Sequence, residues 1–328
     1  MNWKLSNVIN RGNMVKPGIW TGLLIILLLV PLFVKSSYLI HIFNLTFIYI
    51  IVAVSFRTIL TSGQMPLAHA GFMGIGAYVS AIAAKSFGLT PWLSIPLGAL
   101  VAMGIGILIG YPFARLRAVY YAMISLFFGM LIISAVKALA EWTGGAAGLT
   151  NIPPLLGFSK VPYYYFFLVL TTITLIILYR LEISRPGLTW KAIAQSHLVA
   201  ASVGINEARY RIISLAIGCL FAGIAGATYA HYNTVIGPPS FSFMATIMLV
   251  IYVTVGGVGN FSGPIVGVFL LMTIPELARG LREYVPYISA AIVLIVVFLM
   301  PNGVTGLAKT FIAWIAKQRK SRRPSNAS

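Results

Sequence analysis

The sequence contains no aspartate, and only five of its 328 residues are glutamates. These are Glu141, Glu182, Glu207, Glu276 and Glu283. We expect all five in loops or near the ends of apolar segments. Proton- and sodium-coupled carriers usually place an acidic side chain within the membrane as the coupling site. Only Glu276, near the end of an apolar segment, could fill that role, so an ion-coupled carrier is disfavoured.

Groups for catalysis and metal binding are also scarce. Cys219 is the single cysteine, so no disulfide framework exists. The four histidines, at positions 41, 69, 197 and 231, show no metal-ligand spacing. The stretch "GLAKT" at 306–310 lacks the upstream glycine spacing of a phosphate-binding loop. We therefore expect no enzyme and no cofactor in this chain, and any ATP-Mg would bind to a partner chain.

Long apolar runs dominate what is present. Hydrophobic residues make up 59% of the chain, charged residues only 9%, and the mean hydropathy is +0.94. Runs of 18 or more uncharged apolar residues predict membrane-spanning helices. The fold class is therefore all-α, a polytopic bundle of about ten spans. The expected spans are 18–35, 38–56, 66–85, 91–113, 118–140, 162–180, 211–231, 241–256, 264–280 and 286–308.

Lysine and arginine counts orient these spans. With a cytoplasmic start, 17 Lys and Arg residues fall on the cytoplasmic side and 6 on the other, as the positive-inside rule requires. We predict a cytoplasmic amino-terminal segment (1–17), a transmembrane domain (18–308) and a basic cytoplasmic tail (309–328). The basic residues that give the net charge of +18 flank the spans, and this arrangement favours anionic lipid over nucleic acid as their partner.

Three sequence features concern the interior of the bundle. Small residues recur every fourth position from Gly98 to Gly110 and from Ser214 to Ala230, a pattern typical of close helix packing. The stretch "GGVGNFSGP" after the span at 241–256 is either a tight turn or a break within one re-entrant element. Gln64 and His69, in "TSGQMPLAHAGF", either satisfy the start of a helix or line a pathway. With Asn44 and Asn233, they are our candidate polar residues of a translocation path.

One polar segment interrupts the apolar pattern, "RPGLTWKAIAQSHLVAASVGINEARYR" from Arg185. We interpret residues 185–206 as a short cytoplasmic helix that Pro186 opens and Gly204 and Asn206 end. Its 3/4 spacing places Trp190, Ile193, Ala194, His197, Ala201 and Gly204 on one face. Such a helix could lodge in a partner's groove or rest on lipid headgroups.

Six motifs, in order, resemble those of the permease subunits of ATP-binding-cassette importers for branched-chain amino acids, and the longer permease of that pair above all. The motifs are "SGQMPLAHAGFMGIGAYVSA", "RLRAVYYAMISLFFG", "WTGGAAGLTNIP", "AASVGIN", "FAGIAGATYAHY" and "GGVGNFSGPIVGVFLL". The resemblance runs from about residue 45 to 306. It departs from the family at Ala68 and Ala118, where glycine is usual, and in the few charges of "AQSHLVAAS".

The resemblance implies a permease that pairs with a second, related permease and with two ATPase chains. A periplasmic binding protein would deliver substrate near the loop 142–153. The segment around "AASVGIN" would be the coupling loop that docks on an ATPase, with Ala200 and Ala201 on the docking face and Gly204 forming the turn that leaves it. The complete set of expected coupling residues is Trp190, Ile193, His197, Ala200, Ala201, Gly204 and Asn206.

The expected function is therefore inward transport of leucine, isoleucine or valine across the bacterial inner membrane by alternating access. Similar permeases handle urea and short amides, which a mostly apolar path would suit nearly as well. A stand-alone channel or facilitator shares the acid-poor, glycine-rich interior but leaves the polar segment at 185–206 unexplained.

Overall fold

The computed structural model describes residues 26–32, 36–116, 118–277, 294 and 303–306. Within these ranges the regular structure is helical, apart from one isolated antiparallel pairing between Leu149 and Ile236. Residues 26–32 and 303–306 are helical as well. The named helices are α2 (Ser37–Leu60), α3 (His69–Ser86), α4 (Pro91–Phe113), α5 (Ala118–Ala138), α6 (Ala140–Thr143), α7 (Lys160–Ile183), α8 (Arg185–Gln195), α9 (His197–Ser202), α10 (Glu207–Asn233), η2 (Pro238–Phe241), α11 (Phe243–Gly256) and α12 (Gly263–Leu277).

Five of these helices are long and apolar enough to cross a membrane, namely α2, α4, α5, α7 and α10. They confirm the five spans predicted at 38–56, 91–113, 118–140, 162–180 and 211–231. Helix α3 covers the predicted span at 66–85 but begins at His69, after the turn that Pro66 and Gly63 form. All-helical spans are expected because lipid offers no partner to a backbone N–H or C=O group.

The two outermost predicted spans lie largely outside the described residues. Of 18–35 the structure describes 26–32, and of 286–308 it describes 294 and 303–306. The predicted amino-terminal segment (1–17) and basic tail (309–328) also lie outside the described residues. The helical, multi-pass architecture therefore rests on α2 to α12.

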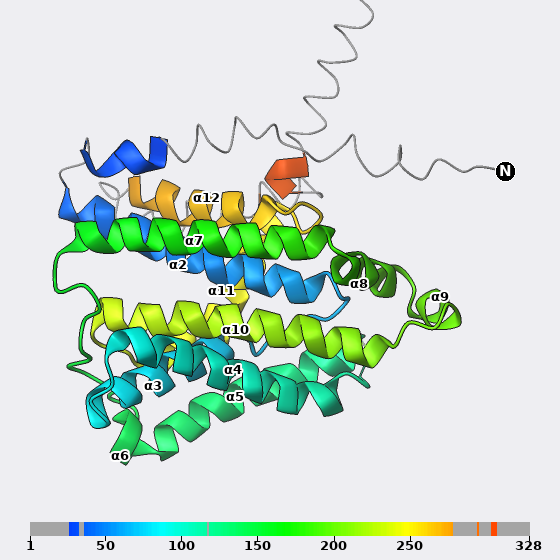
Figure 1. Ribbon diagram of the computed structural model, residues 1–328, viewed down its shortest axis with the longest axis horizontal. Coiled ribbons are helices and arrows are strands. Elements are labelled where there is room, and N and C mark those ends of the chain that lie inside the picture. Colours follow the sequence, from blue (N-terminus) through cyan, green and yellow to red (C-terminus); the bar gives the residue numbers. More distant parts are fainter. Residues whose placement is uncertain (1–25, 33–35, 117, 278–293, 295–302, 307–328) are drawn as a thin grey trace, which may run out of the picture.

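Helix α10 lies at the centre of the bundle, with α2 and α7 on one side and α3, α4 and α5 on the other (Figure 1). The small-residue series on α4 packs against Cys219 and Leu215 of α10, whereas the series on α10 faces α2 at Gly218 and α3 at Gly226. A Cβ atom added at Gly106 would lie 2.8 Å from the Sγ atom of Cys219. At Gly226, an added Cβ would overlap the backbone carbonyl of Met73 in α3. The close packing expected from these series is confirmed, because only glycine fits at such a crossing.

The stretch "GGVGNFSGP" forms a tight turn between two separate helices. Helix α11 ends at Gly256 and α12 begins at Gly263, and the two fold back on each other so that Gly267 lies against Tyr252. This arrangement favours the tight-turn interpretation over a break within one helix.

Phe241 and Thr246, on either side of the start of α11, are buried in the bundle, whereas Phe243 and Met244 between them are exposed. Phe241, in η2 just before α11, packs on Gly74 and Tyr78 in the interior of α3. The Oγ1 atom of Thr246 accepts the backbone N–H of Ala70 at 3.3 Å. With 14 residues, α11 is about 21 Å long, shorter than the ~30 Å hydrocarbon core of a bilayer. The spans predicted at 241–256 and 264–280 are therefore matched only by two shorter apolar helices, α11 and α12.

Candidate functional site

The polar segment after α7 forms two helices and not the single helix expected from its spacing. Helices α8 and α9 project from the end of the bundle where α7 ends and α10 begins (Figure 1). Ser196 separates them with an extended backbone (φ −159°, ψ 107°), and its Oγ accepts the backbone N–H of Val199 at 3.4 Å. Serine at such a position is a favoured N-cap. This local signal overrides the continuous 3/4 pattern.

The seven predicted coupling residues fall into two groups, one buried and one at or near the surface. Trp190, Ile193 and Ala200 are buried against the rest of the chain. The indole N–H of Trp190 donates to the carbonyl of Tyr210 at 2.8 Å, which ties α8 to the first turn of α10. Trp190 and Ile193 therefore anchor the segment to the bundle. Ala200, expected on the docking face, points inward instead.

The remaining coupling residues lie at or near the surface. His197 is half-buried, whereas Ala201, Gly204 and Asn206 are exposed. Gly204 has a φ of +83° and donates its N–H to the carbonyl of Ala201 at 2.9 Å, so the sharp turn predicted there is confirmed. Asn206 is the N-cap of α10, because its Oδ1 accepts the N–H of Arg209 at 3.1 Å. The coupling role of all seven residues stays a prediction.

Sequence reasoning missed the apolar surface of this segment. Leu198, Val199 and Val203 are 69%, 64% and 71% exposed, although the segment lies outside the predicted spans. We call these three residues the α9 apolar surface. The predicted face ran through Trp190 along one continuous helix, which left these side chains out. Recognising Ser196 as an N-cap would have restarted the periodicity at α9 and shown them.

The four candidate path residues are not brought together. Gln64 and His69 lie at the junction of α2 and α3, on the same end of the bundle as α8. Gln64 accepts a hydrogen bond from Ser62 at 3.4 Å, and the Nε2 atom of His69 lies 2.9 Å from the Oγ of Ser55. Neither contact reaches the backbone at the start of α3, where Thr246 accepts the N–H of Ala70, so a helix-start role for Gln64 and His69 stays a prediction.

Asn44 and Asn233 lie near the opposite end of the bundle. The amide of the buried Asn44 donates to the carbonyl of Lys160 at 3.1 Å and to the hydroxyl of Tyr232 at 3.2 Å. Asn233, the next residue after Tyr232, is half-buried at the end of α10. A path role for these asparagines, as for Gln64 and His69, stays a prediction.

A buried polar cluster fixes the loop at 144–153 to the end of the bundle opposite α8. The Nε2 atom of His231 lies 2.9 Å from the Oγ of Ser80 and 3.0 Å from that of Ser94. Its Nδ1 lies 2.7 Å from the carbonyl of Pro153. Helices α3, α4 and α10 and the loop therefore meet at one imidazole. No local sequence signal could have shown this, because the partners are 78 to 151 residues apart.

A buried ionic cluster lies at the end of the bundle that carries α8. Arg57 of α2, only 2% exposed, forms a two-pronged ion pair with Glu182 of α7, with N–O distances of 2.6 and 3.1 Å. Lys191 of α8 reaches the same carboxylate at 2.8 Å. The Nε of Arg57 also donates to the carbonyl of Val258, in the turn between α11 and α12, at 2.8 Å. Helices α2, α7 and α8 and the α11–α12 turn therefore meet at the Arg57–Glu182 pair.

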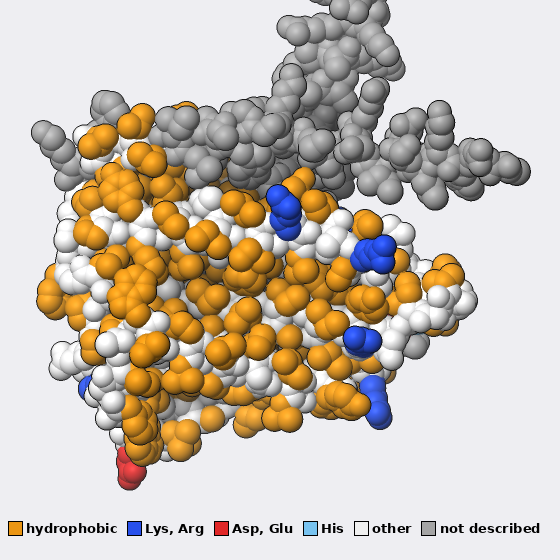
Figure 2. Space-filling view, in the orientation of Figure 1, with side chains coloured by type: hydrophobic (Ala, Val, Ile, Leu, Met, Phe, Trp, Pro, Cys, Tyr) orange, Lys and Arg blue, Asp and Glu red, His pale blue; other side chains and the backbone are white. Residues whose placement is uncertain are grey.

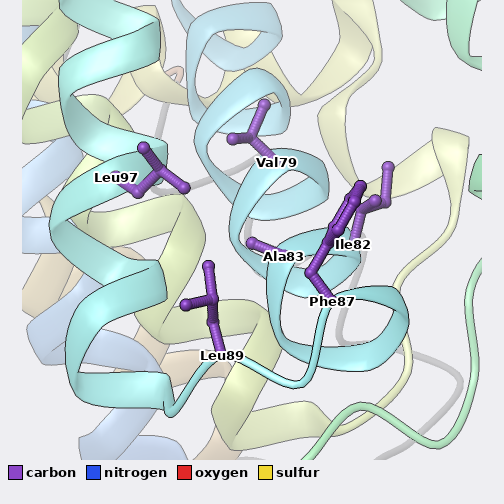
Figure 3. Close-up of a pocket in the computed structure, with 6 residues that line it drawn as sticks. All are labelled: Val79, Ile82, Ala83, Phe87, Leu89 and Leu97. Carbon is purple, nitrogen blue, oxygen red and sulfur yellow. The ribbon is translucent and has the colours of Figure 1, made fainter.

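A shallow apolar groove of about 460 Å³ lies between α3 and α4 at the end opposite α8 (Figure 3). Six apolar residues line it, and none is a predicted path residue: Val79, Ile82, Ala83, Phe87, Leu89 and Leu97. All six lining side chains are apolar, so the groove offers no side-chain partner to a charged group.

The visible surface suits a lipid environment. Hydrophobic side chains cover the middle of the bundle, and Lys and Arg side chains gather toward the end with α8 and α9 (Figure 2). Large exposed apolar residues on α4, α5 and α7 include Leu108, Phe127 and Ile176. Such continuous apolar surface is typical of a membrane-spanning bundle.

The sequence of the chain matches the family model described as "Branched-chain amino acid transport system / permease component" over residues 38–301. The chain belongs to this family. The match covers every described helix from α2 to α12, so the bundle, the segment α8–α9 and the α11–α12 turn all belong to the family domain.

Curated relatives agree with this membership. The high-affinity branched-chain amino acid transport system permease protein LivM of Salmonella typhimurium is 27% identical over 95% of this chain and 80% of its own length. LivM of Escherichia coli K12 is 28% identical over 91% and 77%. The permease protein LivH of Salmonella typhimurium is 27% identical, but over 74% of this chain and 86% of its own length. No solved structure matches.

Proposed function

We propose that this chain is the transmembrane permease subunit of an ATP-binding-cassette importer for leucine, isoleucine and valine. Its relatives LivM and LivH are permeases of branched-chain amino acid transport systems. Since the chain resembles both relatives, we propose that it pairs with a second, related permease. The observation that carries the docking part of the proposal is the α9 apolar surface, Leu198, Val199 and Val203. Exposed apolar side chains on a segment that projects beyond the spans mark a contact with a protein or with the membrane, and we propose a protein partner.

The partner of the α9 apolar surface would be an ATPase subunit, one of two in the complex. ATP-Mg would bind to those chains and not to this one. Closure of the ATPase pair would move α8 and α9, and the bundle would change between inward- and outward-facing states around the path. A substrate-binding protein would deliver the amino acid at the end with the loop 142–153.

Orientation follows from the distribution of positive charge. The 17 to 6 asymmetry of Lys and Arg supports an orientation with α8, α9 and both chain ends in the cytoplasm. We therefore propose a location in the bacterial inner membrane, with the His231 cluster near its outer side. Tags at residue 1 or 328 that a membrane-impermeant reagent labels in intact cells would overturn this orientation.

The docking proposal is tested by purifying the tagged complex in mild detergent and identifying its subunits by mass spectrometry. We expect an ATPase and a second permease to co-purify. Val199→Glu, which places a charge on the α9 apolar surface, should reduce recovery of the ATPase but not of the second permease. Phe158→Glu is the matched control, because Phe158 is 87% exposed in the loop after α6, far from α9 along the bundle.

Recovery of this chain alone, still able to pass solute without ATP, would replace this proposal with a stand-alone facilitator. Equal loss of the ATPase in Val199→Glu and Phe158→Glu would show that the α9 apolar surface is not the docking site. Substrate is tested separately, by uptake of labelled leucine in cells with and without the chain. Competition by urea or acetamide, but not by isoleucine or valine, would assign the chain to the short-amide permeases.

A further inference from the structure

The position of Arg57 requires an explanation beyond stability. Its guanidinium lies near the end of α2, 2% exposed, in a helix that crosses the membrane. A buried arginine is costly unless its charge and its donors are all paired. A leucine or isoleucine at this position would avoid that cost. The charge is therefore expected to serve a contact that an apolar side chain cannot make.

The contacts of Arg57 join two parts of the chain that are far apart in sequence. Its two terminal nitrogens donate hydrogen bonds to the carboxylate of Glu182, which lies one turn before α8 begins. Its Nε donates to the carbonyl of Val258, and its guanidinium lies 5.8 Å from the centre of the Phe261 ring. Val258 and Phe261 both belong to the turn between α11 and α12. One rigid, planar group therefore spans from the base of α8 to this turn.

Helix α8 is closely attached to Glu182 by two further contacts. Gly187, in the first turn of α8, lies directly against the backbone carbonyls of Leu181 and Glu182. Lys191, one turn later, adds its ammonium to the Glu182 carboxylate at 2.8 Å. Lys191 is 43% exposed, so this ion pair contributes less than the buried one. A displacement of α8 therefore displaces Glu182.

We propose that Arg57 and Glu182 are positioning residues that make the α11–α12 turn follow the movement of α8. This inference rests on the proposed function, in which an ATPase moves α8 and α9. The bidentate geometry suits this role, because a fork bound to a carboxylate fixes direction as well as distance. The turn joins α11 to α12, and the buried Thr246 of α11 reaches the interior of the bundle, where its Oγ1 accepts the N–H of Ala70 in α3.

Two matched substitutions separate this role from ordinary stability. Glu182→Gln removes the charge that Arg57 and Lys191 share while keeping the size of the side chain. Glu207→Gln makes the same change in a comparable ion pair, in which Glu207 is 19% exposed and Glu182 13%. The Glu207 pair, with Arg211 at 2.7 Å, lies within α10 and does not reach the α11–α12 turn.

The first measurement is a distance between spin labels at Gln195→Cys in α8 and Val258→Cys in the turn, with the buried Cys219 changed to alanine. Both labelled positions are exposed. We expect a narrow distance distribution in the otherwise unchanged chain and in Glu207→Gln. Glu182→Gln should broaden it. An equally narrow distribution in Glu182→Gln would overturn the proposal, and this reading needs no ATPase.

The second measurement is leucine transported per ATP hydrolysed by the purified complex in liposomes. In Glu182→Gln we expect this ratio to fall about fivefold or more, with ATPase subunits still bound, while Glu207→Gln leaves it unchanged. A broadened distance with an unchanged ratio would show that the pair is structural only and would overturn the positioning role. If the proposed function is wrong, no ATPase will co-purify with the unsubstituted chain. In that case the distance between the spin labels alone tests the link between α8 and the α11–α12 turn.

Discussion

Replacing Gly226 with alanine should destabilise the bundle because α3 and α10 cross at that position without space for a side chain. A Cβ at Gly226 would overlap the carbonyl oxygen of Met73 and lie 2.7 Å from its carbonyl carbon. Carbon atoms in contact lie about 3.5–4.0 Å apart, so the two helices would have to separate by about 1 Å. Such a gap forfeits a quarter to a half of the dispersion energy of the contacts around it.

The magnitude follows from two opposing effects. Overpacking a well-packed interior costs about 1–3 kcal/mol. Alanine at a helical position recovers up to about 1 kcal/mol relative to glycine. With the full gain from alanine, the expected net loss at Gly226 is therefore up to about 2 kcal/mol. Gly104 in α4 is the control, because an added Cβ there meets nothing within 4 Å and only the gain remains.

The assay is the temperature at which the purified protein loses its monodisperse peak in detergent, measured for Gly226→Ala and Gly104→Ala. We expect Gly226→Ala to lower this temperature and Gly104→Ala to leave it unchanged or raise it. Because the overlap involves a backbone carbonyl, adding Met73→Ala should not restore Gly226→Ala. Shifts of the same sign and size in both glycine variants would refute the packing argument.

Three further predictions concern other parts of the chain. His231→Ala should lower the stability of the protein by about 1–3 kcal/mol and increase hydrogen exchange in the loop 144–153. Ser94→Ala leaves two of the three histidine contacts, so its cost should be smaller. Equal hydrogen exchange in the two variants would contradict this prediction. Gly204→Val should strain the positive-φ turn by about 1–3 kcal/mol and weaken co-purification of the ATPase, whereas Gly204→Asn should be tolerated. Equal recovery of the ATPase with both variants would show that the turn adapts to the β-branched side chain. Trp190→Phe removes the hydrogen bond to α10 and should lower stability by about 1 kcal/mol, whereas Trp190→Ala also removes the buried ring and should lower it by about 3–5 kcal/mol. Thermal unfolding measures both losses. Similar losses of stability would mean that the packing of the indole matters little.

The sequence predicted the helices of the bundle well because their signals are local. The span predicted at 91–113 coincides with α4, whose start is marked by Pro91 and whose length follows from an uninterrupted apolar run. The small-residue series predicted close packing, since small residues at every fourth position lie on one helical face. They could not show the neighbours, which for the α10 series are α2 at Gly218 and α3 at Gly226.

The polar segment shows where periodicity fails. One continuous helix was expected from the 3/4 spacing between Trp190 and Gly204, but Ser196 caps a second helix and turns Ala200 inward. When a spacing pattern continues across a helix cap, it combines residues from the faces of two different helices into one apparent face. The exposed residues Leu198 and Val199 were therefore missed, although they lie only a few positions from those that were chosen.

The ionic cluster could have been narrowed from composition alone. A membrane-embedded Arg57 needs an acidic partner on its own side, and the absence of aspartate leaves Glu182 and Glu207 as the cytoplasmic candidates. Both α7 and α10 pack on the end of α2, so choosing between them requires knowing which of the two Arg57 points toward. That information lies in the packing of helices 125 residues apart and not in any local pattern.

The two kinds of contact in this bundle imply different capacities for movement. At Gly226 and Gly76, backbones touch, so any rotation of α10 against α3 meets the carbonyl groups of the facing helix. Interfaces of this kind are expected to move as one body. The α11–α12 turn, in contrast, is joined to α7 and α8 through the side chains of Arg57 and Glu182, which can re-pair without a backbone clash. A transition between inward- and outward-facing states is therefore expected to change the position of this hairpin and of α8, while α3, α4 and α10 stay together.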